Sequence, residues 1–303
     1  MKTIMIDDLK VSNIALGCMR IASKSNEEVE ELVLEALDLG INFFDHADIY
    51  GGGVSETKFG YVLKKHPELR DKMVIQTKCG IKDNSYDFSK QYIIDSVNGS
   101  LERLNTDYID ILLLHRPDAL MDPIEVASAF DELYKTGKVK HFGVSNMNAY
   151  QIELLQKYCK QKICINQLQL SLAHTCLIDE GMYVNMKNDE GISRDGNDVL
   201  NYCRLNNITV QAWSILQIDL DRGTFLDSPD YKELNAKLEK YSNKYSVSKS
   251  CIAVSWILRH PANIQAIAGT TNLNHLKQLV MANDFELEHD EWYDLYSADK
   301  VLA

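Results

Sequence analysis

Two kinds of pattern alternate along this 303-residue chain, and the alternation limits the folds open to it more than any other feature. Short apolar runs typical of buried strands are each followed by a longer amphipathic stretch typical of a helix, and the pair recurs eight times. Each helix must return the chain so that the next strand runs in the same direction, which requires a parallel sheet. The predicted strands cover residues 14–19, 42–44, 73–77, 109–114, 141–144, 163–167, 208–212 and 264–268, and the predicted helices residues 27–39, 56–65, 90–104, 123–135, 149–160, 198–205, 247–259 and 273–282.

Eight such units favour closure of the sheet into an α/β fold of the (β/α)8 TIM-barrel class. An open doubly wound sheet is the alternative, but the dinucleotide fingerprint G-x-G-x-x-G and the phosphate loop G-x-x-x-x-G-K-[ST] are both absent from the sequence. An N-terminal β-hairpin and extra helices at residues 231–245 and 288–297 are expected outside the eight units. No linker-like stretch interrupts the pattern, so residues 1–303 are predicted to form a single domain.

The composition narrows the class of partner. A net charge of -12 disfavours nucleic acid and anionic membrane surfaces as partners. The N-terminus lacks the apolar run of a signal peptide, and no stretch is long enough to span a bilayer. The seven cysteines are scattered without a C-x-x-C pair, which indicates reduced thiols rather than a zinc or dithiol site. These features predict a soluble, cytoplasmic protein and say nothing about its substrate.

One long connection stands apart from the repeating units. Residues 171–197 are polar and punctuated by glycine, which predicts a lid or binding loop on the catalytic face. The identity of a substrate would depend on this segment, on the other loops after the strands and on the C-terminal segment after residue 288. The sequence does not define their shapes.

Polar residues follow the predicted strands at the end where a barrel of this kind carries its chemistry. They are Asp45 and Tyr50 after the second strand, Lys78 after the third, His115 after the fourth, Ser145 and Asn146 after the fifth, Gln167 after the sixth, Trp213 and Ser214 after the seventh, and Gly269, Thr270 and Thr271 after the eighth.

Four of these residues together predict a proton donor. Each alone has an ordinary interpretation as a turn, packing or surface residue, but all four are expected on one rim, from neighbouring strands. A tyrosine has a pKa near ~10, and an adjacent ammonium is expected to lower the pKa of Tyr50. Asp45 would hold Lys78, and His115 would position a carbonyl oxygen beside the phenol. Such a site can protonate an oxygen while negative charge develops on it, as hydride addition to a carbonyl requires.

The motifs that carry these residues resemble those of the aldo-keto reductase family. The matching stretches are D-H-A-D-I-Y-G-G at 45–52, K-C-G at 78–80, L-L-H-R-P-D at 113–118, G-V-S-N at 143–146, N-Q-L-Q-L-S at 166–171, Q-A-W-S at 211–214 and A-G-T-T-N at 268–272. The resemblance therefore extends over nearly the whole chain, and the combination of the first two motifs is similar to a bacterial oxidoreductase subgroup.

The resemblance implies an NADP(H)-dependent barrel of the monomeric type, either a monomer or a weak homo-oligomer, without a bound metal. Tyr50 would be the general acid, with Asp45, Lys78 and His115 in support. Trp213 would stack on the nicotinamide ring, and Met19 and Arg20 would border cofactor and substrate. The remaining contacts implied by the resemblance are Ser145, Asn146 and Gln167 at the carboxamide, Ser214, Leu216 and Gln217 at the pyrophosphate, and Gly269, Thr270, Thr271, His275 and Gln278 at the adenosine phosphate.

The sequence departs from the family pattern at the adenosine end. Gly269 and His275 stand where many members carry a lysine and an arginine for the 2′-phosphate, and Leu279 replaces an asparagine. A histidine is mostly neutral near pH 7, whereas an arginine keeps its charge. A helix N-terminus after Asn272 still suits a phosphate. NADP(H) is therefore preferred, and NAD(H) stays open.

Two other classes of function compete with carbonyl reduction. His46, Asp48 and His115 prompt a barrel metal hydrolase, although the sequence shows no cluster of histidines at several strand ends. The second competing class is a non-catalytic regulatory subunit that senses the cofactor, because some relatives of the family act in that way. Metal analysis and a turnover measurement would separate the three.

Overall fold

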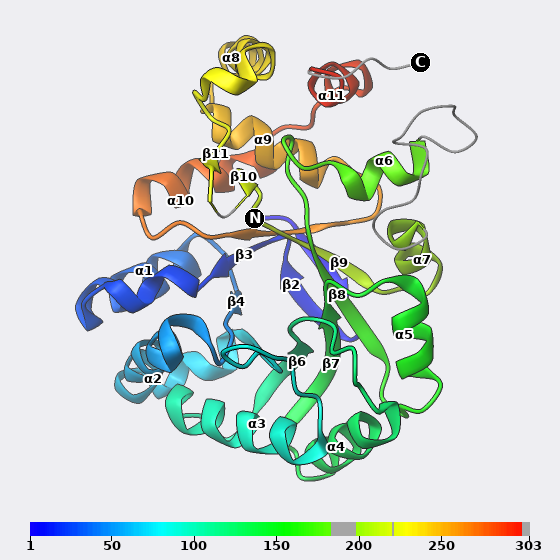
Figure 1. Ribbon diagram of the computed structural model, residues 1–303. Coiled ribbons are helices and arrows are strands. Elements are labelled where there is room, and N and C mark those ends of the chain that lie inside the picture. The colour runs from blue at the N-terminus through cyan, green and yellow to red at the C-terminus, as the bar shows by residue number, and fades with distance from the viewer. Residues whose placement is uncertain (183–197, 220, 299–303) are drawn as a thin grey trace.

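A closed barrel of eight parallel strands forms the centre of the protein (Figure 1). The computed structural model describes residues 1–182, 198–219 and 221–298. Around the barrel the strands are hydrogen-bonded in the order β12-β3-β4-β5-β6-β7-β8-β9, so every strand lies beside its neighbour in the repeating pattern. Their bounds are β3 Ile14–Gly17, β4 Phe43–Asp45, β5 Val74–Cys79, β6 Ile109–Leu114, β7 Val139–Ser145, β8 Ile163–Gln169, β9 Thr209–Trp213 and β12 Gln265–Ala268. The predicted (β/α)8 barrel is confirmed.

Helices follow the strands and surround the barrel, as Figure 1 shows. Local sequence explains their limits: in the first helix, Ser25 and Glu28 form a capping box, and the chain leaves the helix through Gly40 at φ 83°. The helices of the eight units are α1 Asn26–Asp38, α2 Val54–Lys65, α3 Lys90–Leu104, α4 Pro123–Lys135, α5 Ala149–Gln156, α7 Val199–Leu205, α9 Lys249–Leu258 and α10 Leu273–Val280.

Several elements lie outside the eight units. The predicted N-terminal hairpin is present as β1 Thr3–Ile6 and β2 Leu9–Ser12, and the predicted extra helices as α8 Lys232–Tyr245 and α11 His289–Tyr296. A short helix, α6 Cys176–Met182, and a second hairpin, β10 Gln217–Asp219 with β11 Gly223–Thr224, were not predicted, because neither is long enough to show a period in the sequence. Of the predicted lid, residues 183–197 lie outside the described part of the chain.

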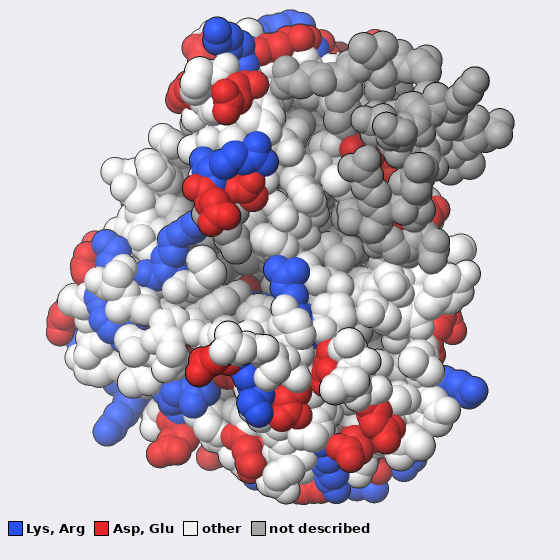
Figure 2. Space-filling view, viewed as in Figure 1, with Lys and Arg blue, Asp and Glu red and all other residues white. Residues whose placement is uncertain are grey.

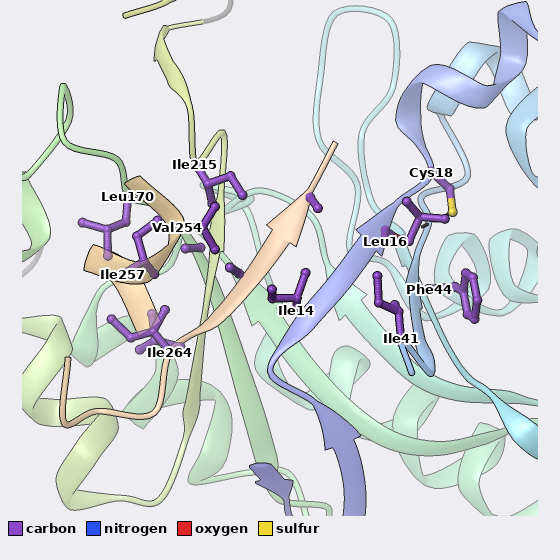
Figure 3. Close-up of a cluster of buried hydrophobic side chains, with 14 of the residues drawn as sticks. Ile14, Leu16, Cys18, Ile41, Phe44, Leu170, Ile215, Val254, Ile257 and Ile264 are labelled. Atoms are coloured by element: carbon purple, nitrogen blue, oxygen red, sulfur yellow. Dashed lines mark hydrogen bonds between the residues drawn. The ribbon is translucent and has the colours of Figure 1, made fainter. Parts of the chain in front are cut away.

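Apolar side chains form two separate clusters. The larger fills the space between the sheet and its helices, where Ile14, Leu16 and Phe44 on the strands pack with Val254 and Ile257 of α9 (Figure 3). The smaller cluster joins the N-terminal hairpin to inward-facing strand residues, namely Ile6 and Val11 with Ala15, Phe43, Val74, Ile111, Leu113, Cys164, Ile165 and Ile267. The hairpin therefore seals one end of the barrel with apolar side chains and leaves polar chemistry to the other end.

The first strand ends earlier than predicted. It was expected to continue to residue 19, but β3 ends at Gly17 and Met19 begins the 3₁₀-helix η1 Met19–Ser23. The Cys18 amide donates to the carbonyl of Asp45 at 2.8 Å, which turns the chain across the mouth of the barrel. No helix within the described ranges is long and apolar enough to cross a membrane.

Candidate active site

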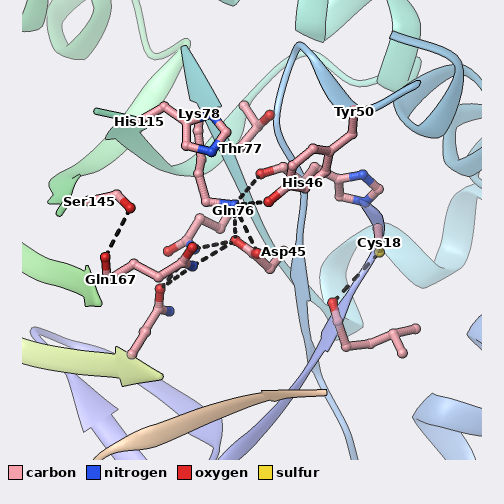
Figure 4. A network of polar contacts seen from close by, with 12 residues as sticks. Cys18, Asp45, His46, Tyr50, Gln76, Thr77, Lys78, His115, Ser145 and Gln167 are labelled. Atoms are coloured by element: carbon pink, nitrogen blue, oxygen red, sulfur yellow. Dashed lines mark hydrogen bonds and ion pairs between the residues drawn. The ribbon is translucent and has the colours of Figure 1, made fainter. Parts of the chain in front are cut away.

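Lys78 lies at the centre of the polar network at the open end of the barrel (Figure 4). Its ammonium is 2.8 Å from Asp45 Oδ1, 2.9 Å from Asp45 Oδ2 and 3.0 Å from the Tyr50 hydroxyl oxygen, and it also donates to the carbonyl of His46 at 2.8 Å. The Lys78 side chain is fully buried, and Asp45 is buried beside it. Every donor of this buried ammonium thus has an oxygen partner.

Strand register explains why these side chains meet. β4 pairs with β5 in parallel, with Asp45 opposite Gln76, so that Asp45, Gln76 and Lys78 all point into the barrel. Tyr50 follows on the 3₁₀-helix η2 Tyr50–Gly53, where Gly51 has a φ of 59°. A side chain at Gly51 would also lie 2.5 Å from Ala22 Cβ, so glycine allows the loop to fold the phenol back over Lys78.

His115 closes the quartet from the neighbouring strand. Its backbone amide donates to the carbonyl of Cys79 at 2.9 Å, and its ring lies 5.9 Å from the Tyr50 ring, edge to face at 81°. Burial, with the positive charges of Lys78 and Arg116, lowers the pKa of His115 to about 2. The imidazole is therefore neutral at physiological pH and carries a single N–H.

The electrostatics of Tyr50 correct one expectation. The sequence predicted a lowered pKa, but burial raises the pKa of Tyr50 above its ordinary value, and the Lys78 ammonium opposes this shift without reversing it. Burial also acts to lower the pKa of Lys78, but Asp45 and Tyr50 outweigh it and the net pKa of Lys78 is raised. At neutral pH the phenol keeps its proton and the amine keeps its charge, which is the state that a proton donor needs.

The residues expected at the nicotinamide are connected to one another by hydrogen bonds. Ser145 Oγ donates to the carbonyl of Gln167 at 2.9 Å, and Asn146 Nδ2 donates to Ser145 Oγ at 2.8 Å. Trp213 Nε1 donates to Asn146 Oδ1 at 3.2 Å. The structure therefore brings together side chains from β7, β8 and β9 in one hydrogen-bonded group, in which Ser145 and Gln167 are buried and Asn146 and Trp213 are half-buried.

Gln167 belongs to a ladder of buried glutamines that the sequence analysis missed. Gln76 Nε2 and Gln167 Nε2 each donate both to Asp45 Oδ1, at 2.5 and 3.1 Å, and to Gln211 Oε1, at 2.9 Å each. Gln211 Nε2 in turn donates to Gln265 Oε1 at 2.7 Å, and Gln265 Nε2 donates to the carbonyl of Ser12 at 2.7 Å. The ladder fixes the orientation of each amide and leaves the Gln167 Oε1 atom for an outside donor. A glutamine inside an otherwise apolar strand was the available signal.

The other predicted cofactor residues border the same opening. Ser214, at φ 54°, donates through Oγ to Gln217 Oε1 at 2.6 Å, which ties the turn after β9 to β10, and Leu216 lies half-buried between them. Arg20 Nη1 donates to the carbonyl of Gly269 at 3.0 Å, so η1 lies beside the loop after β12. The remaining members lie on exposed or half-buried surface in η1, in the loop after β12 and in the first turns of α10, and are Met19, Thr270, Thr271, His275 and Gln278.

The N-terminus of α10 is capped by a side chain of the chain itself. Asn272 caps this helix by accepting from the amides of Asn274 and His275, at 2.9 and 3.1 Å. Leu279, which replaces an asparagine of the family pattern, is 2 % exposed and belongs to the apolar core. The two residues of this helix that were predicted to meet a nucleotide, His275 and Gln278, are both exposed.

The residues that prompted a metal hydrolase do not assemble as ligands. Among the described residues, Asp7, Asp8 and His141 at the hairpin end of the barrel have ligand atoms within 4.8 Å of one another, whereas His46, Asp48 and His115 belong to no such group. Burial lowers the pKa of His46 to about 3, and its ring packs edge to face on Phe59. His46 is therefore a neutral packing residue behind the site.

Comparison with known proteins agrees with this geometry. The model of the aldo/keto reductase family matches residues 13–300. The chain belongs to this family. Oxidoreductase YcsN of Bacillus subtilis is 34% identical over 97% of this chain and 96% of its own, and a 6-dehydroglucose reductase of Agrobacterium fabrum is 34% identical over 96% and 95%. A Klebsiella pneumoniae aldo/keto reductase, solved in complex with NADP and acetate, has the same fold, with a TM-score of 0.75 at 22% identity over 97% of this chain and 94% of that one.

Proposed function

We propose that the protein is an NADP(H)-dependent reductase that converts an aldehyde or ketone into an alcohol, with Tyr50 as the general acid. The observation that carries the proposal is the buried contact of Lys78 with both the Tyr50 hydroxyl, at 3.0 Å, and the Asp45 carboxylate, at 2.8 Å. A cation fixed at this point favours the negative charge that remains on the phenol oxygen after its proton has left.

Each member of the quartet has a separate task in this reaction. The Tyr50 hydroxyl donates its proton to the carbonyl oxygen of the substrate. The neutral His115 ring offers an N–H to the same oxygen and orients it. Lys78 stabilises the phenolate that Tyr50 becomes, and Asp45 holds Lys78 in place. The ladder of glutamines supports Asp45 from below, because Gln76 and Gln167 both donate to its Oδ1 atom.

The donor set beside the quartet fits a nicotinamide cofactor. Both hydrogens of Gln167 Nε2 are used within the barrel, so its Oε1 atom can accept from a carboxamide N–H. Trp213, held by Asn146, offers an aromatic face. When bound, the reduced cofactor supplies the hydride for the carbonyl carbon. The preference for NADP(H) rests on the family resemblance, on the NADP bound to the Klebsiella relative and on the helix N-terminus that follows Asn272.

The decisive experiment compares the parent with Tyr50→Phe. We expect the parent to oxidise NADPH in the presence of at least one aldehyde, ketone or quinone from a panel, measured by absorbance. Tyr50→Phe should lose about 10³-fold in kcat, since general acid catalysis contributes ~10²–10⁴-fold. Quenching of protein fluorescence by NADPH should stay within about 3-fold in Kd, because the phenol is not among the proposed cofactor contacts.

Two results would contradict the assignment. Carbonyl reduction by Tyr50→Phe at the parent rate would remove Tyr50 as the acid. Tight NADPH binding by a parent that reduces no member of the panel would instead favour the cofactor-sensing regulatory role.

A further inference from the structure

Arg116 follows His115 directly on the loop after β6, and its side chain lies against the wall of the proposed site. Its guanidinium carbon is 5.5 Å from the centroid of the Trp213 ring. Trp213 is held in turn by the hydrogen bond from its Nε1 atom to Asn146. The charge is also close enough to His115 to contribute to the lowering of the pKa of that ring. Arg116 therefore lies near both His115 of the quartet and Trp213 of the proposed nicotinamide contacts.

This guanidinium lacks an oxygen partner, unlike the other arginines of the described chain. Arg116 forms no hydrogen bond or ion pair with any of the described residues, and its guanidinium lies over the Trp213 ring. The others all have acceptors: carboxylates for Arg70, Arg103, Arg222 and Arg259, and neutral oxygens for Arg20 and Arg204. Arg116 is half-buried. A permanent charge with five unused donors in such a place is poised for an anion.

The positive charge of Arg116 contrasts with the negative net charge of the chain. The chain carries a net charge of -12, and Figure 2 shows acidic side chains spread mainly over the outer parts of the visible face. A negatively charged substrate would gain nothing from that surface and needs a cation at the site itself. The planar fork of an arginine matches the two oxygens of a carboxylate.

We propose that Arg116 forms an anion subsite that binds a carboxylate on the carbonyl substrate, so that the protein prefers oxo-acids and carboxylated aldehydes over their uncharged analogues. This inference rests on the proposed reduction of a carbonyl. Because Arg116 is adjacent to His115, one loop holds both ends of the substrate: the imidazole meets the carbonyl oxygen and the guanidinium meets the carboxylate. The loop after β6 thus sets specificity as well as chemistry.

The test uses pairs of aldehydes that differ only in charge. These are 4-carboxybenzaldehyde with 4-formylbenzamide, and succinic semialdehyde with 4-oxobutanamide, each with saturating NADPH. We expect the parent to favour the carboxylate of at least one pair by about tenfold in kcat/KM, because a charge-assisted bidentate contact is worth more than a neutral one. Arg116→Gln should lower kcat/KM for that carboxylate by about 30-fold, mainly through KM, and change the amide by less than about 3-fold.

Two further variants control for charge and for folding. Arg116→Lys keeps the charge but not the fork, and should retain a part of the preference. Arg204→Gln, which removes an exposed arginine bonded to Asn201 on α7, should leave both members of each pair unchanged. The proposal would be overturned if Arg116→Gln lowered kcat/KM equally for the carboxylate and the amide of a pair. It would also be overturned if the variant changed only KM for NADPH.

A binding measurement separates this inference from the proposed function. Calorimetric titration of 4-(hydroxymethyl)benzoate into the protein with NADP⁺ needs no turnover. Binding by the parent that is weakened about tenfold or more in Arg116→Gln supports the anion subsite even if no carbonyl is reduced. Binding of equal strength in both proteins rejects the subsite and leaves the reductase proposal standing.

Discussion

Two buried polar clusters lie on opposite sides of the same pair of strands, β4 and β5. The inner cluster faces the barrel interior and consists of Asp45, Tyr50, Gln76 and Lys78. The outer cluster faces α2 and α3 and consists of Asp48, Glu56, Thr77 and Arg103. Because successive strand residues point to opposite faces, Thr77 and Lys78 are neighbours in sequence but belong to different clusters.

Each cluster contains a carboxylate–cation pair at the same distance. Lys78 is 2.8 Å from Asp45, and Arg103 is 2.8 Å from Glu56. The outer pair is completed by Thr77, whose hydroxyl donates to Glu56 at 2.5 Å, and it is covered by helices. The inner pair is completed by the Tyr50 phenol at the open end of the barrel. A buried ion pair alone is therefore no sign of catalysis. The clusters differ in the residue that joins the ion pair, Thr77 or Tyr50, and only the inner cluster lies at the open end of the barrel, where a cofactor could reach it.

The largest effect is expected from Lys78→Met. This change leaves the buried Asp45 without its cation, so the free energy of unfolding should fall by about 3–5 kcal/mol. The reduction rate per folded molecule should fall by about 10²-fold or more, because the charge that stabilises the phenolate is lost. Denaturant titration combined with kcat, normalised to the folded fraction, measures both. An unchanged kcat would show that the ion pair of the inner cluster, like that of the outer one, is not needed for the reaction.

The matched change in the outer cluster is Glu56→Gln. It keeps the shape of the side chain but removes the charge that faces Arg103, whose side chain is 31% exposed and can still reach water. We expect the free energy of unfolding to fall by about 2–3 kcal/mol. The kcat of the folded protein should stay within about 3-fold of the parent. A loss of kcat as large as that of Lys78→Met would show that the reaction depends on both clusters.

Asp48 of the outer cluster is expected to make the free energy of unfolding depend on pH. Burial, together with the negative charge of Glu56, raises its pKa from 3.8 to about 7. A raised acid pKa favours the protonated folded state, so the stability that Asp48 contributes is complete below pH 4 and is lost as the pH rises to 7. Asp48→Asn should remove this loss, and its advantage over the parent should grow by about 2 kcal/mol between pH 4 and 7. Denaturation curves at several pH values test the trend, and the difference between the two proteins cancels the effect of the buried histidines. A difference independent of pH would contradict it.

The smallest effect is expected in the pH dependence of kcat, which should show no inflection between pH 5 and 9. The pKa of His115 is lowered to about 2, and that of Tyr50 is raised above its ordinary value of 10. Neither group changes its charge between pH 5 and 9, so kcat for reduction should stay level over that range. The pH profile of kcat, measured on the hydride-transfer step, tests this directly. An inflection near pH 6.5 would show that the imidazole becomes charged in the complex.

Much of the fold and of the site could be predicted from the sequence because both depend on local order. Repeating strand and helix patterns define the parallel barrel, and the quartet follows from which residues end each strand. The glutamine ladder could not be predicted, since Gln76, Gln211 and Gln265 are far apart in sequence and meet only when the barrel closes. The β10–β11 hairpin was missed because its strands are too short to show alternation.

The sequence by itself determined the order of the strands, the closed parallel sheet and the set of side chains at its open end. The reason is that side chains alternate along a strand and each crossover helix returns the chain to the same edge. Only the tertiary structure decided how those side chains behave. The pKa of Tyr50 rises instead of falling because burial outweighs Lys78, and Arg116 lies over Trp213 without an oxygen partner among the described residues. Desolvation and the pairing of charges depend on atoms brought together from across the whole chain, and no local pattern records them.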